Sequence, residues 1–161
     1  MLNNLERLIQ LAEEVFSART DPDQLDVDEE VLNSLKNIHP ASVSELDVGQ
    51  GPIAWVLVIP TTTEIMTQFL HRKMSEKDIL DLTPEGGTYD TLYLCSALVL
   101  EEYRQKGIAK ELCIKAIEKI CVDHPLKALF VWSFTKEGEQ LADKVAKQVG
   151  LPIFKRTEIH K

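Results

Sequence analysis

The sequence predicts an α/β fold in which a mixed central sheet is flanked by helices, with two helices at the N-terminus. Three observations lead to this fold class. The chain has 161 residues, of which 44% are hydrophobic, enough to bury one core without metals or disulfides. Two long apolar runs, 53–59 and 92–100, have the length and composition of buried strands. After residue 90, strand and helix patterns alternate, which favours one α/β domain over residues 1–161.

The first forty residues form an N-terminal helical part. Leu5, Leu8, Ile9 and Ala12 recur at helical spacing, and the acidic, proline-containing stretch 21–23 ends this first helix. A second helix begins after Asp28 as its N-cap and stops before the His-Pro pair at 39–40.

The middle of the chain combines a central strand with two short helices. Residues 53–59 are apolar throughout, as expected for a strand buried on both faces. A helix then extends to about His71. Ser75 and Asp78 have capping-box spacing for another short helix that ends near Leu82. The proline and glycines of 84–87 indicate a turn.

The sequence pattern of the second half of the chain predicts a strand, a helix, a strand, a helix and a strand, in that order. The strand at 92–100 is followed by a helix that starts near Ala109 and stops at the His-Pro pair 124–125. Residues 126–134 form a buried strand. The last helix ends at Gly150, and 151–154 form an edge strand because Pro152 cannot donate to a ladder.

The charge balance excludes several classes of partner. Eighteen basic against 26 acidic residues give a net charge of −8, which argues against nucleic acid and against an anionic membrane surface. We expect neither a membrane span nor a signal peptide. The odd set of Cys95, Cys113 and Cys121 favours reduced thiols in a cytoplasmic protein, and no motif predicts a metal site.

The junction between the strand at 92–100 and the following helix has the features of an anion site. Gly107 permits a tight turn, and the first amides of a helix lack intrahelical partners and lie at the positive end of its dipole. Together they suit a pyrophosphate. Arg104, Lys106 and Lys110 add three cations, which are either phosphate ligands or solvated charges.

This junction resembles the signature of the GNAT superfamily of acyl-CoA-dependent N-acyltransferases, Q/R-x-x-G-x-G/A, here Arg104-x-x-Gly107-x-Ala109. The resemblance covers residues 91–156 and implies an acyl-CoA-binding half. It implies acetyl-CoA or another acyl-CoA as co-substrate, no metal, and a small-molecule or peptide amine as acceptor, and a homodimer is compatible with it. The cofactor-binding residues it implies are Ala97, Leu98, Val99, Arg104, Gln105, Lys106, Gly107, Ile108, Ala109 and Lys110.

The resemblance is weaker at the positions that perform catalysis. The tyrosine that many members use to protonate the thiolate is replaced by Ala146, and a frequent asparagine by Glu139. Tyr93 stands where some members carry a glutamate base, and it either contacts substrate or packs in the core. Cys95 is the second candidate catalytic residue, although an inert buried thiol explains it better.

Two other functions remain open beside amine acylation. The chain is either an enzyme, a non-catalytic acyl-CoA sensor that kept the loop, or an interaction protein whose N-terminal helices dock a partner. The acidic balance favours a cationic acceptor, although a charge that only keeps the domain soluble explains it equally well.

Overall fold

A five-stranded mixed sheet with the order β1-β2-β3-β4-β5 organises the chain. The computed structural model describes residues 3–17, 25, 27–133 and 135–156. Strands β1 (Val43–Asp47), β2 (Pro52–Thr61) and β3 (Thr91–Val99) are antiparallel to their neighbours in this series. Strands β4 (Ala128–Val131) and β5 (Ile153–Lys155) run parallel to β3. The predicted mixed α/β class is therefore confirmed.

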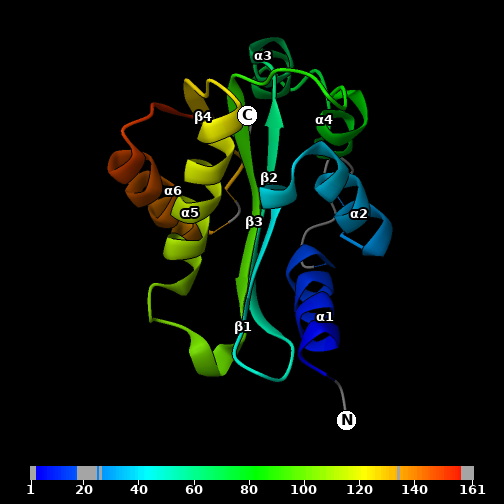
Figure 1. Cartoon of the computed structure of the whole chain (residues 1–161), viewed down its shortest axis with the longest axis vertical. Coiled ribbons are helices and arrows are strands. Elements are labelled where there is room, and N and C mark those ends of the chain that lie inside the picture. Colours follow the sequence, from blue (N-terminus) through cyan, green and yellow to red (C-terminus); the bar gives the residue numbers. More distant parts are fainter. Residues whose placement is uncertain (1–2, 18–24, 26, 134, 157–161) are drawn as a thin grey trace, which may run out of the picture.

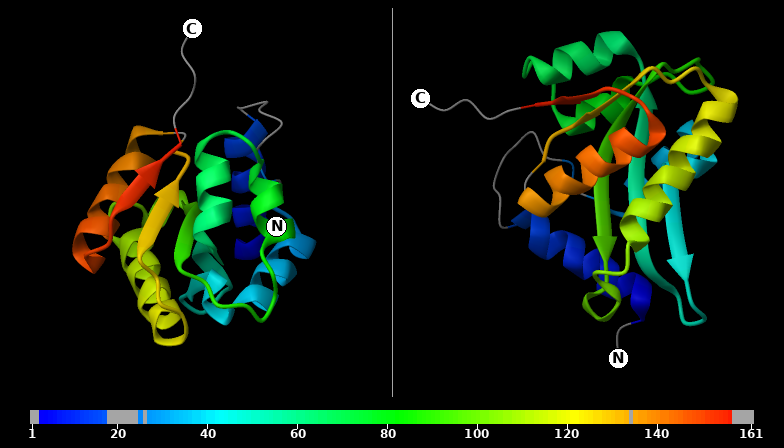
Figure 2. Two further views of the ribbon diagram at one scale, coloured as in Figure 1. Left: turned by 90° about the horizontal axis from the view of Figure 1, so that it is seen from above. Right: turned by 90° about the vertical axis from the view of Figure 1, so that its left-hand side faces the viewer.

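Helices cover both faces of the sheet (Figures 1 and 2). One face is covered by α1 (Asn4–Ser17), α2 (Glu29–Ile38), α3 (Thr63–Leu70) and α4 (Glu76–Leu82). The other face is covered by α5 (Ile108–Asp123) and α6 (Lys136–Val149). Each layer encloses its own cluster of buried apolar side chains, because the strand residues point alternately to the two faces.

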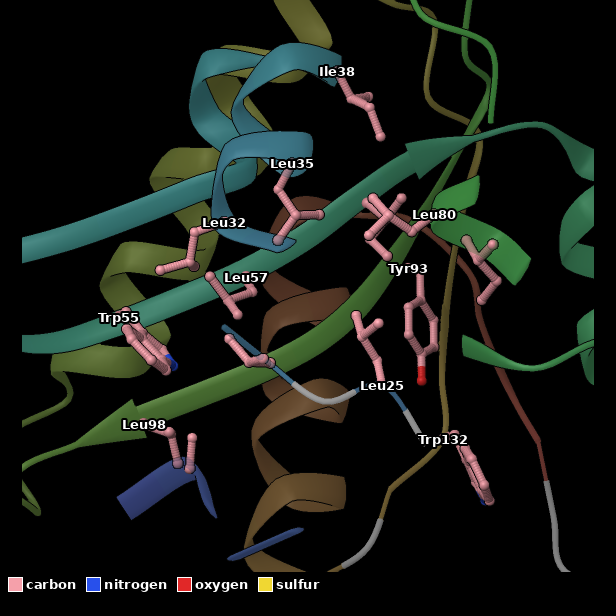
Figure 3. Close-up of a cluster of buried hydrophobic side chains, with 14 of the residues drawn as sticks. Leu25, Leu32, Leu35, Ile38, Trp55, Leu57, Leu80, Tyr93, Leu98 and Trp132 are labelled. Atoms are coloured by element: carbon pink, nitrogen blue, oxygen red, sulfur yellow. The ribbon is translucent and has the colours of Figure 1, made fainter. Parts of the chain in front are cut away.

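The first cluster contains the largest buried side chains of the protein. Trp55 and Tyr93 from the central strands are fully buried there, as is Phe69 of α3. Figure 3 shows Tyr93, Trp132 and Leu25 on the same side of β3, and all three belong to this cluster. This side of the sheet therefore combines aromatic rings from three separate segments.

The helix boundaries follow the capping residues expected from the sequence. Asp28 accepts a hydrogen bond from the Val31 amide at 2.9 Å at the start of α2. Ser75 and Asp78 form a complete capping box on α4, with distances of 2.9 and 3.1 Å. Gly150 ends α6 with a φ of 74°. Residues 21–23, where the sequence predicts the end of the first helix, lie outside the described residues.

Two strands differ from the expectation. The sequence pattern does not predict β1, because its sequence VSELD is polar and only half-buried at the edge of the sheet. Strand β4 ends at Val131 rather than continuing over 126–134. It stops where its neighbour β3 turns away from it, so Trp132 has no partner on β3, and residue 134 lies outside the described residues.

Replacing Ser75 with alanine should destabilise the fold by about 1 kcal/mol, because it removes the side chain that caps α4. The measurement is the free energy of unfolding from denaturant titration. Ser34→Ala is the matched control, since Ser34 lies inside α2, where alanine raises helix propensity. Equal stability of the wild type and Ser75→Ala would contradict the role of the cap.

Candidate active site

Strand β3 carries one extra residue, Cys95, which opens the sheet. Leu57 of β2 lies opposite Ser96, whereas the next residue, Val58, lies opposite Leu94, so Cys95 has no partner on β2. Such a bulge bends its strand and increases the local twist. Pairing between β3 and β4 ends at the same point. Beyond the bulge the two parallel strands diverge and leave a cleft between them.

The cleft contains a cavity of about 280 Å³ between β3, the end of β4 and the start of α6. Its walls are mostly apolar, which suits the flexible arm of a thioester cofactor more than a charged ligand. The described lining residues are Val56, Leu57, Val58, Leu94, Cys95, Ser96, Ala97, Leu98, Cys113, Val131, Trp132, Ser133, Thr135, Glu137, Gly138, Leu141, Ala142 and Val145.

Backbone groups of β3 face this cleft. The Leu100 amide donates to the Ile53 carbonyl of β2 at 2.8 Å. Backbone direction alternates along a strand, so the amides and carbonyls of Ala97 and Val99 point away from β2. Strand β4 does not pair with this part of β3. The amides of Ala97 and Val99 can therefore donate hydrogen bonds to a ligand in the cleft.

A turn rich in free amides follows β3. It begins with the short 3-10 helix η2 (Glu101–Tyr103) and ends at Ile108, the first residue of α5. Gln105 and Gly107 adopt the left-handed conformation, with φ of 66° and 73°. Among the described residues, no protein acceptor bonds to the amides of 105–110. Amides that converge at a helix N-terminus form an anion site.

The charged side chains beside the turn have separate roles. Arg104 is exposed, and its Nε donates to the Val99 carbonyl at 3.1 Å. Lys106 is also exposed and lies 5.8 Å above the Tyr103 ring. Arg7 of α1 pairs with both carboxylate oxygens of Glu102 at 2.8 and 3.0 Å, and this hydrogen bond lowers the Glu102 pKa. The pair neutralises a carboxylate next to the turn.

The two candidate catalytic residues occupy different environments. Tyr93 is fully buried, and its hydroxyl donates to the Glu76 carboxylate at 2.5 Å. Burial, with the Glu76 charge, raises the Tyr93 pKa well above its usual value. Cys95 lines the cavity, and burial together with Glu76 raises its thiol pKa as well. Neither group is arranged as an ionised nucleophile or base at neutral pH.

The structure brings together most of the cofactor-binding residues expected from the sequence. Ala97 and Leu98 line the cavity, and Val99 adds its backbone to the same edge. Residues 104–110 form the turn. Tyr93 lies outside the described cavity lining, behind the bulge. These placements leave the assignment of catalytic residues a prediction.

The two residues that depart from the family pattern, Ala146 and Glu139, lie outside the described cavity lining. Ala146 is buried in the cluster between α5, α6 and the sheet, and is not among the described residues that line the cavity. Glu139 lies on the surface and pairs with Lys155 of β5 at 2.9 Å. Neither position presents a hydroxyl or amide to the cleft.

Several residues of the site are not evident from the sequence. Cys113 of α5 and the first turn of α6, with Thr135 and Gly138, complete the cavity wall. The sequence does contain one signal for these residues. They lie where strand β4 leads into helix α6, just as the predicted site lies where β3 leads into α5. Glu76 has no such signal, because it reaches Tyr93 from a segment 17 residues away in sequence.

The described residues contain neither a metal cluster nor a membrane-spanning helix. Within residues 3–156, apart from the undescribed positions, no three histidine, cysteine or acidic side chains gather as a metal site. In the same part of the chain, every helix is too short or too polar to cross a bilayer.

Comparison with known proteins gives one result. A sequence model of the acetyltransferase (GNAT) family matches residues 6–150. The match starts in α1, so it extends well beyond the residues 91–156 to which the sequence signature pointed. No curated protein and no solved structure gives a significant match.

Iodoacetamide should label Cys121 much faster than Cys95 or Cys113, because the thiolate is the reactive form. Cys121 is exposed, whereas Cys113 is buried and Cys95 is only partly exposed. Burial raises the pKa of all three thiols, that of Cys113 to about 12 and that of Cys95 well above its usual value. Acetyl-CoA should slow the labelling of Cys95 further, with Cys121 as the internal control. Peptide mass mapping measures all three rates. Labelling of Cys95 that is insensitive to acetyl-CoA would contradict the location of the cleft.

Proposed function

Because the chain belongs to the GNAT acetyltransferase family, we propose that it transfers an acetyl or related acyl group from acyl-CoA to an amine acceptor. The family supports acyl-CoA-dependent acyltransferase chemistry, and members act on amine acceptors. The observation that carries the proposal is the combination of the cleft beyond the bulge at Cys95 with the free amides of 105–110. The cleft suits the acylated thiol arm of the cofactor, and the free amides suit its pyrophosphate.

The residues of the chain mainly bind and align the reactants in this proposal. Acyl-CoA supplies the activated thioester. The amides of 105–110 hold phosphate oxygens without depending on side chains, and the cations of Arg104, Lys106 and Lys110 strengthen the local field. The apolar walls exclude water from the thioester, and alignment of the amine with the carbonyl contributes most of the acceleration.

Backbone amides also supply the electrophilic assistance. The amides of Ala97 and Val99 face the cleft, so one of them can donate to the thioester oxygen as it gains negative charge. Ala146 cannot protonate the leaving thiolate. We propose that the thiolate leaves unprotonated or takes a proton from water, since a thiol, with an ordinary pKa of about 8.5, is a good leaving group near neutral pH.

The remaining features belong to the same proposal. The three described free cysteines, with no disulfide among them, are in keeping with a cytoplasmic protein. Homodimerisation remains compatible with the fold.

A non-catalytic acyl-CoA sensor is the second candidate, and the observation in its favour is Ala146 in place of the family tyrosine. Release of CoA thiol that depends on an added amine, measured over a panel of amines, distinguishes the enzyme from the sensor.

Acetyl-CoA at one hundred times its dissociation constant should stabilise the wild type by about 2.7 kcal/mol. Gly107→Asp should abolish this stabilisation, because it puts a negative charge beside the free amides. Thermal unfolding with and without acetyl-CoA measures both effects. A wild-type melting curve that millimolar acetyl-CoA leaves unchanged would reject the proposed function.

Two control variants separate charge from backbone strain in this experiment. Gly107→Asn introduces a side chain of nearly the same size without the charge, and asparagine tolerates the left-handed conformation, so most of the stabilisation should remain. Gly86→Asp introduces the same strain and charge at another turn. Gly86 also has a φ of 73°, and a Cβ at either glycine would have no neighbouring atom within 4 Å. Gly86→Asp should keep the full response to acetyl-CoA.

Ala146→Tyr should lower the free energy of unfolding by about 1–3 kcal/mol without raising turnover, because Ala146 is 5% exposed in a packed cluster. Gln148→Tyr, on the exposed side of the same helix, is the control and should change neither property. Denaturant titration and CoA release give the two readouts. A large gain in turnover in Ala146→Tyr would show instead that the natural chain lacks an acid it can use.

A further inference from the structure

The two ends of the cavity differ in polarity and in exposure. At one end, Thr135 and Glu137 are exposed and Gly138 is half-buried, so the first turn of α6 forms a polar mouth. Val58 of β2 and Val145 of α6 also line the cavity, and both are fully buried. The cavity therefore leads from a polar opening at the surface to an apolar inner end within the protein.

Helix α6 and strand β3 run along the length of the cavity and measure its depth. Gly138 and Val145 both line it, and seven helical residues rise about 10 Å. On the other wall, β3 lines the cavity from Leu98 back to Leu94, about 13 Å of extended strand. Leu94 is also the last residue of β3 that pairs with β4. The inner end therefore lies where the two parallel strands come together.

The proposed contacts of acyl-CoA determine where its acyl group points. The pyrophosphate lies at the amides of 105–110, and the thioester oxygen lies at the amide of Ala97 or Val99. The arm of the cofactor therefore occupies the side of these amides that faces the turn, and the acyl group extends beyond them towards Leu94. From Ala97 to Leu94 the strand spans about 10 Å. An extended hydrocarbon advances about 1.3 Å per carbon, so an acetyl group leaves most of this length unfilled.

The surroundings of the inner end favour an uncharged group. Cys113 lines the cavity and belongs to the same buried apolar cluster as Val58 and Val145. Burial raises the pKa of its thiol to about 12. Burial and the negative charge of Glu76 raise the pKa of the Cys95 thiol on the opposite wall. A carboxylate at the end of an acyl chain would therefore lose its hydration and also be repelled.

We propose that the inner end of the cavity is an acyl-chain pocket, that the protein takes an unbranched, uncharged acyl group of about four to six carbons, and that Cys113 and Val145 limit its length. This inference rests on the proposed acyltransferase function and adds the class of acyl donor. Each methylene that enters the pocket should strengthen binding about fourfold, the effect of removing one CH₂ group from water.

Two other uses of the cavity make different predictions. If the arm of the cofactor fills the inner end, the acyl group lies elsewhere, and narrowing the pocket should weaken CoA and all of its thioesters equally. If the space is only imperfect packing, the affinity for acyl-CoA should not depend on the length of the acyl chain. Affinities of a series of thioesters therefore separate the three possibilities without an amine acceptor.

The first test measures the dissociation constants of the wild type for CoA, acetyl-CoA, butyryl-CoA, hexanoyl-CoA and succinyl-CoA by isothermal titration calorimetry. Butyryl-CoA should bind about fifteenfold more tightly than acetyl-CoA, and hexanoyl-CoA more tightly still. Succinyl-CoA has the same chain length as butyryl-CoA but carries a carboxylate, and it should bind no better than acetyl-CoA. Equal affinities for acetyl-, butyryl- and hexanoyl-CoA overturn the proposal. Binding of none of the five compounds rejects the acyltransferase function itself.

The second test narrows the pocket. Cys113→Leu should remove the advantage of hexanoyl-CoA over acetyl-CoA and leave the affinities for CoA and acetyl-CoA close to those of the wild type. Cys121→Leu, at an exposed position of the same helix, is the matched control and should keep the full advantage. An equal loss of affinity for CoA, acetyl-CoA and hexanoyl-CoA in Cys113→Leu overturns the proposal, because it puts the arm of the cofactor at this wall.

The third test has the opposite sign and does not depend on the folding of Cys113→Leu. Val145→Ala lengthens the pocket, so octanoyl-CoA should gain at least fourfold in affinity relative to butyryl-CoA. Val149→Ala is the matched control, because Val149 packs against the same cluster but is not among the described residues that line the cavity. The same ratio of affinities in Val145→Ala, Val149→Ala and the wild type overturns the proposal.

Discussion

One extra residue in β3 determines how the rest of the molecule is arranged. The bulge at Cys95 ends the pairing of β3 with β4, so a sheet that would otherwise be continuous opens between two parallel strands. The amides of Ala97 and Val99 lose their strand neighbour and become available to a ligand. The bent strand then leads directly into the turn before α5. The cleft and the strand amides therefore follow from a single irregularity of pairing, and the anion site at the start of α5 adjoins them. Apolar layers cover both faces of the sheet.

The two faces of the sheet differ in the kind of core that they support. The face under α5 and α6 buries aliphatic side chains and small residues, including Ala146. The opposite face combines aromatic rings with a buried glutamate and a buried arginine. Burial of charged groups is unfavourable unless they are paired or hydrogen-bonded, and here Tyr93, the Leu25 amide and the Met74 carbonyl supply hydrogen bonds. Glu76 and Arg156 therefore lie among the aromatic side chains of the face away from α5 and α6.

Local signals in the sequence are sufficient to predict most of the fold. Asp28, Ser75 and Gly150 cap helices as expected, because capping depends on residues within one turn. Strand β1 gives no signal because an edge strand needs no apolar run, and the bulge gives none because it depends on pairing with a distant strand. The turn at 104–110 is predictable from Gly107 and its neighbours. The contacts of Glu76 with Tyr93 and of Arg156 with Trp132 are not, since each joins segments that are separated in the sequence and meet only through the tertiary fold.

The turn before α5 binds through main-chain groups, and this affects how its sequence can change over time. Gly107 has a φ of 73°, a conformation that residues with a side chain rarely adopt. A Cβ at this position would have no neighbouring atom within 4 Å. Selection at this position therefore acts on backbone conformation rather than on space. Lys106 and Lys110 contribute to the field around the turn, whereas Arg104 also donates a hydrogen bond to the Val99 carbonyl. Related proteins can therefore keep the backbone conformation of such a site while its side chains change. A single glycine can then be the one residue of the site that still indicates common descent.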